Sequence, residues 1–324
     1  MTMNRRRLLL TLAAAKIAAP AWAQDKYPIR PVSIVVPFPP GGAVDFVART
    51  VGQKLGSALG VPVVVENKAG AGGTIGAAFV AKAKPDGYTL LLGGSATQVF
   101  GPALYKKLQY DAKQDFAPIG QISAGPLVLV TGSKVPATDI PQLKQYLKEQ
   151  GVRGFYGSNG NGTFPHLAAE LFKQANQLPS AHIPYSGGAA ALTALLGGDI
   201  AYSINHIPVV QAMVKSGRLR ALATTGRNRS VVFPNLPTLD EAGMKGFEAN
   251  AWWGLFAPAG TPPAIVQALN EALAAALRDP AVRTALEAQG DEVSYSTPKD
   301  FAAFVSAETT KWTKVVKTAD LQLD

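Results

Sequence analysis

Three glycine-rich segments have the composition of an anion-binding site, because each lies between an expected strand and an expected helix. They are the segments 37–42 (PFPPGG), 156–163 (YGSNGNGT) and 184–188 (PYSGG). At such a junction, unpaired backbone N–H groups and the positive end of the helix dipole favour a negatively charged ligand. Glycine lets the backbone approach a ligand, and proline fixes the loop before binding. Ordinary tight connections use the same residues, so the prediction requires the segments to meet at one crevice.

Residues suited to catalysis or to metal binding are few. The chain has three histidines and no cysteine, which excludes disulfides and thiolate chemistry. Ser158 and His166 could belong to a hydrolase triad, but Ser158 does not lie in a Gly-x-Ser-x-Gly elbow. His166 and Glu170 could contact one metal ion, yet no third ligand accompanies them. We therefore expect no catalytic residue, no metal and no cofactor, and a hydrolase stays only as an alternative.

Nucleotides and nucleic acids are disfavoured as ligands. The glycines at 70, 72, 73 and 76 do not match Gly-x-Gly-x-x-Gly, and no P-loop sequence is present. The formal net charge is +9, but the first 16 residues contain four of the cations, and the rest are scattered along the chain. A nucleic-acid binder would concentrate Lys and Arg in a stripe with aromatic residues. The mild positive field suits a small anion better.

The first 23 residues have the pattern of a signal peptide. Arg5, Arg6 and Arg7 precede the apolar run 8–15, and Ala21-Trp22-Ala23 is a small-x-small cleavage site. We expect cleavage after Ala23 and export to the periplasm, by either the general or the twin-arginine route. Because no later stretch has 18 uninterrupted apolar residues, we expect a soluble mature protein.

The elements that would position the glycine-rich segments alternate between strand and helix patterns. Apolar runs at 32–36 and 127–131 are typical of buried strands. Val44, Val47, Val51 and Leu55 recur at three- and four-residue spacing, which predicts one buried helix face. Two such blocks predict an α/β fold with largely parallel sheets. Near the C-terminus, a stripe predicts a helix packed on the core; its residues are Phe301, Phe304, Val305, Trp312 and Val315.

Taken together, these segments resemble the Bug-type extracytoplasmic solute receptors of tripartite tricarboxylate transporters. The resemblance covers nearly the whole chain after residue 24. It rests on PFPPGG with Asp45 and Arg49, NKAGAGG at 67–73, PDGYTL at 85–90, YGS at 156–158 with His166-Leu167, PYSG at 184–187 and APAGTP at 257–262.

The resemblance implies a two-lobed periplasmic-binding-protein fold of type II. Each lobe would be a mostly parallel sheet flanked by helices, with the ligand in the cleft between the lobes. We expect residues 24–124 and 245–324 to form lobe 1 and residues 125–244 to form lobe 2, with hinges near 123–126 and 241–247. The protein would be a monomer that delivers its ligand to a membrane permease, or alternatively to a sensor protein.

The resemblance also implies the residues that hold a carboxylate, mainly through backbone groups. Many relatives have an Asp where this chain has Asn205. The carboxylate of that Asp can pair with an amino group on the ligand. Because an amide has no charge, we expect a dicarboxylate, hydroxy acid or aromatic acid rather than an amino acid. The expected ligand-binding residues are Phe38, Pro39, Gly41, Gly42, Asp45, Thr97, Ser158, Asn159, Gly160, Thr163, His166, Tyr185, Gly187, Gly188 and Asn205.

Overall fold

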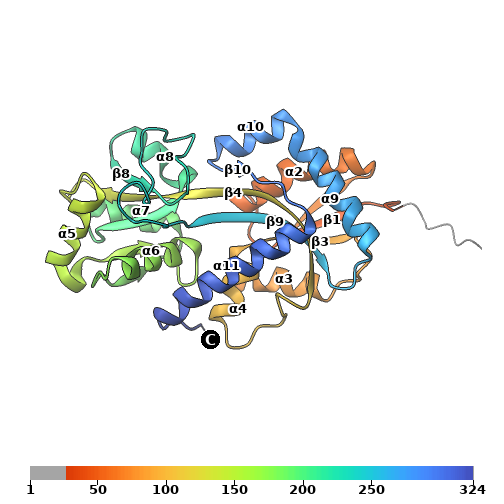
Figure 1. The fold of residues 1–324 in the computed structure, drawn as a ribbon, viewed down its shortest axis with the longest axis horizontal. Coiled ribbons are helices and arrows are strands. Elements are labelled where there is room, and N and C mark those ends of the chain that lie inside the picture. Colours follow the sequence, from red (N-terminus) through yellow and green to blue (C-terminus); the bar gives the residue numbers. More distant parts are fainter. Residues whose placement is uncertain (1–26, 324) are drawn as a thin grey trace, which may run out of the picture.

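A single 17-residue strand, β4 (Phe116–Gly132), runs through both halves of the molecule in the computed structural model, which describes residues 27–323 (Figure 1). As far as Pro126 this strand pairs with β9 (Asn250–Pro258). From Leu127 onward it pairs with β7 (Tyr202–His206) and β8 (Leu219–Thr224) of the other half. The sequence predicted only a strand at 127–131, because Pro118 and Pro126 are unusual inside a strand. Pro118 is tolerated since the register with β9 shifts directly after it, and Pro126 lies at the end of that ladder.

The first half has a mixed sheet between two helical layers. Strand β1 pairs in parallel with β2 and β3, and β3 pairs with β9 in the antiparallel direction. β10 pairs with β4. The elements of this half are β1 (Val32–Val36), α2 (Ala43–Leu59), β2 (Val63–Asn67), α3 (Thr74–Ala81), β3 (Thr89–Gly94), η2 (Ala96–Phe100), α4 (Gly101–Leu104), α9 (Pro263–Arg278), α10 (Pro280–Ala288), β10 (Glu292–Val293) and α11 (Pro298–Thr318).

The second half is built in the same way around the last part of β4. Strand β5 pairs in parallel with β6 and β7, whereas β7 and β8 are antiparallel to β4. Its elements are α5 (Ile140–Gln150), β5 (Tyr156–Ser158), α6 (Phe164–Ala175), β6 (His182–Pro184), α7 (Gly188–Gly197), β7 (Tyr202–His206), α8 (Ile207–Lys215) and β8 (Leu219–Thr224).

The α/β class is therefore confirmed, but the sheets are mixed rather than mostly parallel. The parallel pairs come from the strand–helix–strand units that the sequence pattern predicted. The antiparallel pairs come from β4 and β9, which cross between the halves in opposite directions and pair with each other. A chain that enters and leaves a half along adjacent strands produces this arrangement.

The hydrophobic core positions the helix ends that face the centre of the molecule. The predicted face of α2 is buried, with Val44, Val47, Val51 and Leu55 all at most 7% exposed. One cluster of buried residues continues through both halves and includes Trp312 of α11, which lies across the centre in Figure 1. The predicted α11 stripe is thus core, since Phe301 and Trp312 are fully buried.

The expected signal peptide lies outside the described residues. From residue 27 to residue 323, the structure has no helix that combines the length and the apolar character needed to cross a bilayer.

Candidate functional site

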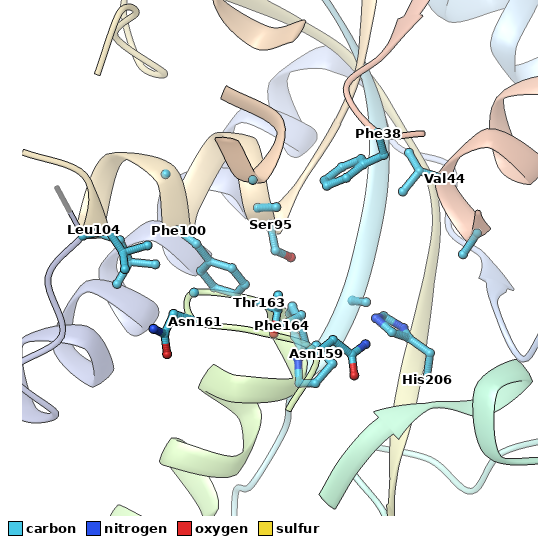
Figure 2. A pocket seen from close by; sticks show the side chains of 18 of the residues that line it. Phe38, Val44, Ser95, Phe100, Leu104, Asn159, Asn161, Thr163, Phe164 and His206 are labelled. Carbon is cyan, nitrogen blue, oxygen red and sulfur yellow. The ribbon is translucent and has the colours of Figure 1, made fainter. Parts of the chain in front are cut away.

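Three α-helices from the two halves begin at a cavity of about 220 Å³ between them (Figure 2). Among the described residues that cap α2, α6 and α8, none makes a side-chain hydrogen bond to its own helix. The first N–H groups of these helices are therefore not used by their caps, which suits an anion at the cavity. Residues at these helix starts that line the cavity are Ala43, Val44, Thr163, Phe164, Pro165 and His206.

The loop before α2 is held by Asp45. Its carboxylate accepts hydrogen bonds from the backbone N–H of Gly41 at 3.0 Å, from Arg49 at 2.9 Å and from Asn67 at 2.9 Å. Asn67 also donates to the carbonyl oxygen of Phe38 at 3.0 Å. Hydrogen bonding to Arg49, with help from Gly41 and Asn67, lowers the pKa of Asp45 to about 2. Asp45 therefore fixes the loop that presents Phe38 to the cavity, and its carboxylate is not part of the wall.

The loop before α6 is closed by hydrogen bonds within it. The Oγ atom of Ser158 donates to the carbonyl of Gly160 at 3.0 Å, and Thr163 Oγ1 donates to the same carbonyl at 2.8 Å. The N–H of Gly162 donates to Nδ1 of His166 at 3.1 Å. Asn159 and Thr163 line the cavity from this loop. The third glycine-rich segment packs behind it, because Tyr185 N–H donates to the carbonyl of Ser158 at 3.1 Å.

Two histidines, His166 and His182, pack against the loop before α6, and neither lines the cavity. The rings of His166 and His182 stack with centroids 3.8 Å apart, and Tyr156 stacks on His182 at 4.9 Å. Burial, followed by the charge of Lys173, lowers the pKa of His166 to about 4. Burial and the neighbouring His166 lower the pKa of His182 to about 3. Both imidazoles are therefore neutral at pH 7, so His166 can accept the Gly162 hydrogen bond.

The sequence suggested that His166 pairs with Ser158 or with Glu170, but in the structure Ser158 and Glu170 each contact other residues. Ser158 contacts Nε2 of His182 at 2.7 Å rather than His166, and Ser158 is fully buried under the loop. Glu170 bonds to Tyr156 and Lys173 rather than to His166. The Ser158–His182 pair is outside the cavity wall, so its role is to hold the loop.

Several polar atoms near the cavity have no hydrogen-bond partner within the described chain. They are Oγ of Ser95, Oδ1 of Asn159 and Oδ1 of Asn205. Asn205 is fully buried at the end of β7 and donates through Nδ2 to Ser203 at 2.7 Å. Buried polar atoms are rarely left unpaired, so these three suggest that a ligand or water completes the site.

The expected site residues fall into two groups. Phe38, Asn159 and Thr163 line the cavity, and most of the others shape the loops behind the wall. Thr97, for example, hydrogen-bonds to Gly94 and closes the turn before η2. The other residues that do not line the cavity are Pro39, Gly41, Gly42, Asp45, Ser158, Gly160, His166, Tyr185, Gly187, Gly188 and Asn205.

Sequence reasoning missed much of the wall. His206 could have been found, because it directly precedes the helix start at Ile207-Pro208. Tyr105 and Leu323 are joined by an isolated β-bridge between distant segments, so no local pattern indicates them. The missed lining residues also include Ser95, Phe100, Leu104, Phe164 and Trp253.

Comparisons with known proteins agree on one family. The chain is 39% identical over 326 residues to the protein BugT of Bordetella pertussis. This alignment covers 99% of the present chain and 100% of BugT. The structure of R. palustris Rpa4515 with adipate matches with a TM-score of 0.81 and 34% identity, covering 91% of this chain and 99% of that one. MatC (Rpa3494) from Rhodopseudomonas palustris with bound malate matches with a TM-score of 0.77 and 35% identity. The match covers 90% of this chain and 100% of the MatC chain.

These relatives are solute-binding proteins rather than enzymes, as the resemblance implied. The family model described as "Tripartite tricarboxylate transporter family receptor" matches residues 47–321. This range includes most of both halves and every helix start at the cavity except that of α2. The chain therefore belongs to the tripartite tricarboxylate transporter receptor family of solute-binding proteins.

Proposed function

We propose that this receptor binds a small organic carboxylate in the cavity between its halves and delivers it to the membrane permease of a tripartite transporter. The observation that carries the proposal is the meeting of the α2, α6 and α8 starts, without side-chain caps, at one cavity. Each helix start favours a carboxylate by about 0.3–2 kcal/mol. The adipate and malate in the two related structures are both small carboxylates, which supports the same ligand class here.

The proposal includes where and how the protein works. Residues 1–23 would direct export and be removed, so that a monomer acts in the periplasm. Residues 24–124 and 245–324 would move as one lobe and residues 125–244 as the other. The change of strand partner between Pro126 and Leu127 supports a hinge close to this boundary. Asn205, which has no charge, supports a ligand without an amino group.

Isothermal titration with a panel of carboxylic acids tests the proposal, together with two variants that add one negative charge. Asn159→Asp places a carboxylate in the wall, so we expect it to abolish binding of any acid that the wild type binds. Asn228→Asp adds the same charge at an exposed position outside this cavity and should leave the affinity within about twofold. If Asn159→Asp binds as tightly as the wild type, or if no acid in the panel binds, the proposal is wrong.

A further inference from the structure

The cavity wall is apolar at the end formed by the side chains of Phe100 and Leu104. In Figure 2, Asn159 and His206 lie toward one end, and Leu104 and Phe100 lie toward the other. Among the described residues that line the cavity, none is Lys, Arg, Asp or Glu. Two residues with polar groups lie near the apolar end, the exposed amide of Asn161 and the phenol of Tyr105, and both are uncharged.

The apolar end is built from fixed side chains of three distant segments. Phe100 of η2 and Phe164 of α6 lie 5.4 Å apart between ring centroids, and the buried Trp312 of α11 lies 5.3 and 5.2 Å from them. The N–H of Leu323 donates to the carbonyl of Leu104 at 2.8 Å, which holds the C-terminal segment against this end. These ring contacts and the backbone hydrogen bond fix the shape of the apolar end, so little ordering of side chains is needed on binding.

A second carboxylate at this end would meet only uncharged donors, the amide of Asn161 and the hydroxyl of Tyr105. Burying an unpaired charge is strongly unfavourable, and the described wall offers no cation there. An apolar cavity of about 150 Å³ is enough for benzene, so about 220 Å³ accommodates a ring together with a carboxylate.

We infer that the ligand is a monocarboxylate with an uncharged, apolar body about the size of one ring. Its carboxylate lies at the helix starts, and its apolar body lies against Phe100, Leu104, Phe164 and Leu323. This inference rests on the proposed function, because it assumes that the helix starts bind a carboxylate, and it then restricts which carboxylate is bound.

Two pairs of acids that differ by one carboxylate test the inference by isothermal titration. The pairs are benzoate with terephthalate, and hexanoate with adipate. We expect the monocarboxylate of each pair to bind the wild type at least about tenfold more tightly. If terephthalate or adipate binds more tightly, the inference is wrong while the proposed function stands. If none of the four acids binds and the wider panel fails as well, the proposed function itself is wrong.

The variant Leu104→Arg provides an independent check, because it places a cation at the apolar end. We expect it to reverse the preference, so that terephthalate and adipate bind more tightly than their partners. Leu104→Gln adds polarity without charge and should weaken the monocarboxylates without favouring the dicarboxylates. Thermal melting confirms that both variants are folded. An unchanged preference in a folded Leu104→Arg variant would show that Leu104 does not contact the distal part of the ligand.

Discussion

His166 connects the loop before α6, which lines the cavity, to the buried core of the second half. It was expected to contact the ligand, but its Nδ1 atom accepts the hydrogen bond of Gly162 and its ring stacks on His182. The residue therefore positions Asn159 and Thr163 rather than forming part of the cavity wall. The sequence pointed to His166 as a site residue but did not show that it holds the loop. That role depends on the contact with His182, which is distant in the sequence.

The variant His166→Phe keeps a ring for stacking but removes the acceptor for Gly162. We expect about fivefold weaker binding of the tightest acid in the panel, since one hydrogen bond contributes about 1 kcal/mol. His166→Asn can restore an acceptor and should recover part of the affinity. Titration calorimetry measures both, with melting temperatures as the control for folding. Equal affinities of His166→Phe and wild type would show that the loop does not need this hydrogen bond.

At the scale of elements, local patterns predicted the strands and helices of each half well. The strand at 32–36, the last part of β4 and the buried face of α2 agree with the sequence patterns. Elements that depend on distant partners were missed. The first part of β4 contains two prolines and two glycines, and it is a strand because β9 and β10 pair with it. The helical region after residue 263 divides at Pro280 into α9 and α10.

Gly76 lets α3 approach the loop before α2 closely. A Cβ atom at Gly76 would lie 2.7 Å from the carbonyl oxygen of Lys68 and 2.8 Å from Cα of Pro37, both backbone atoms that cannot rotate away. We expect Gly76→Ala to destabilise the protein by about 1–3 kcal/mol and to weaken ligand binding, because Pro37 begins the loop that presents Phe38. Urea unfolding and calorimetry measure the two effects.

A glycine in α2 supplies the matched control. A Cβ atom at Gly52 would meet Val63 at 3.4 Å, which is an ordinary contact. Gly52→Ala should therefore be neutral or stabilise the protein by up to about 1 kcal/mol through helix propensity. If Gly76→Ala and Gly52→Ala unfold at the same urea concentration, the close approach of α3 to the loop before α2 does not require a glycine at position 76.

At the scale of the whole molecule, the two halves are connected where β4 and β9 cross, and a carboxyl group lies at this crossing. Asp291 accepts a hydrogen bond from Ser123 Oγ at 3.1 Å, and a Cβ atom at Gly125 would lie 2.2 Å from its Oδ1 atom. Burial raises the pKa of Asp291 to about 6, against the lowering effect of its hydrogen bonds. No sequence pattern indicated this contact, because it joins segments more than 160 residues apart.

Buried histidines and Asp291 shift stability in opposite directions with pH. Burial lowers the pKa of His206 to about 4, as for His166, and that of His182 to about 3. As pH falls below 6.5, the unfolded chain takes up protons on these histidines while the folded chain does not, so stability falls. Below pH 6 the folded chain protonates Asp291 before the unfolded chain does, which opposes this loss. Near pH 5 the unfolded chain should hold about two more protons than the folded chain at these four groups.

The variant Asp291→Asn separates the two contributions. Because it removes the group that opposes the histidines, we expect the urea midpoint to fall more steeply between pH 6.5 and 5 than in the wild type. At pH 7.5, where Asp291 is charged and only partly exposed, the variant should be more stable than the wild type. Asp199→Asn removes the same charge from an exposed position and should follow the wild-type curve. Parallel pH curves for Asp291→Asn and wild type would mean that Asp291 does not hold a proton at the crossing of the two halves.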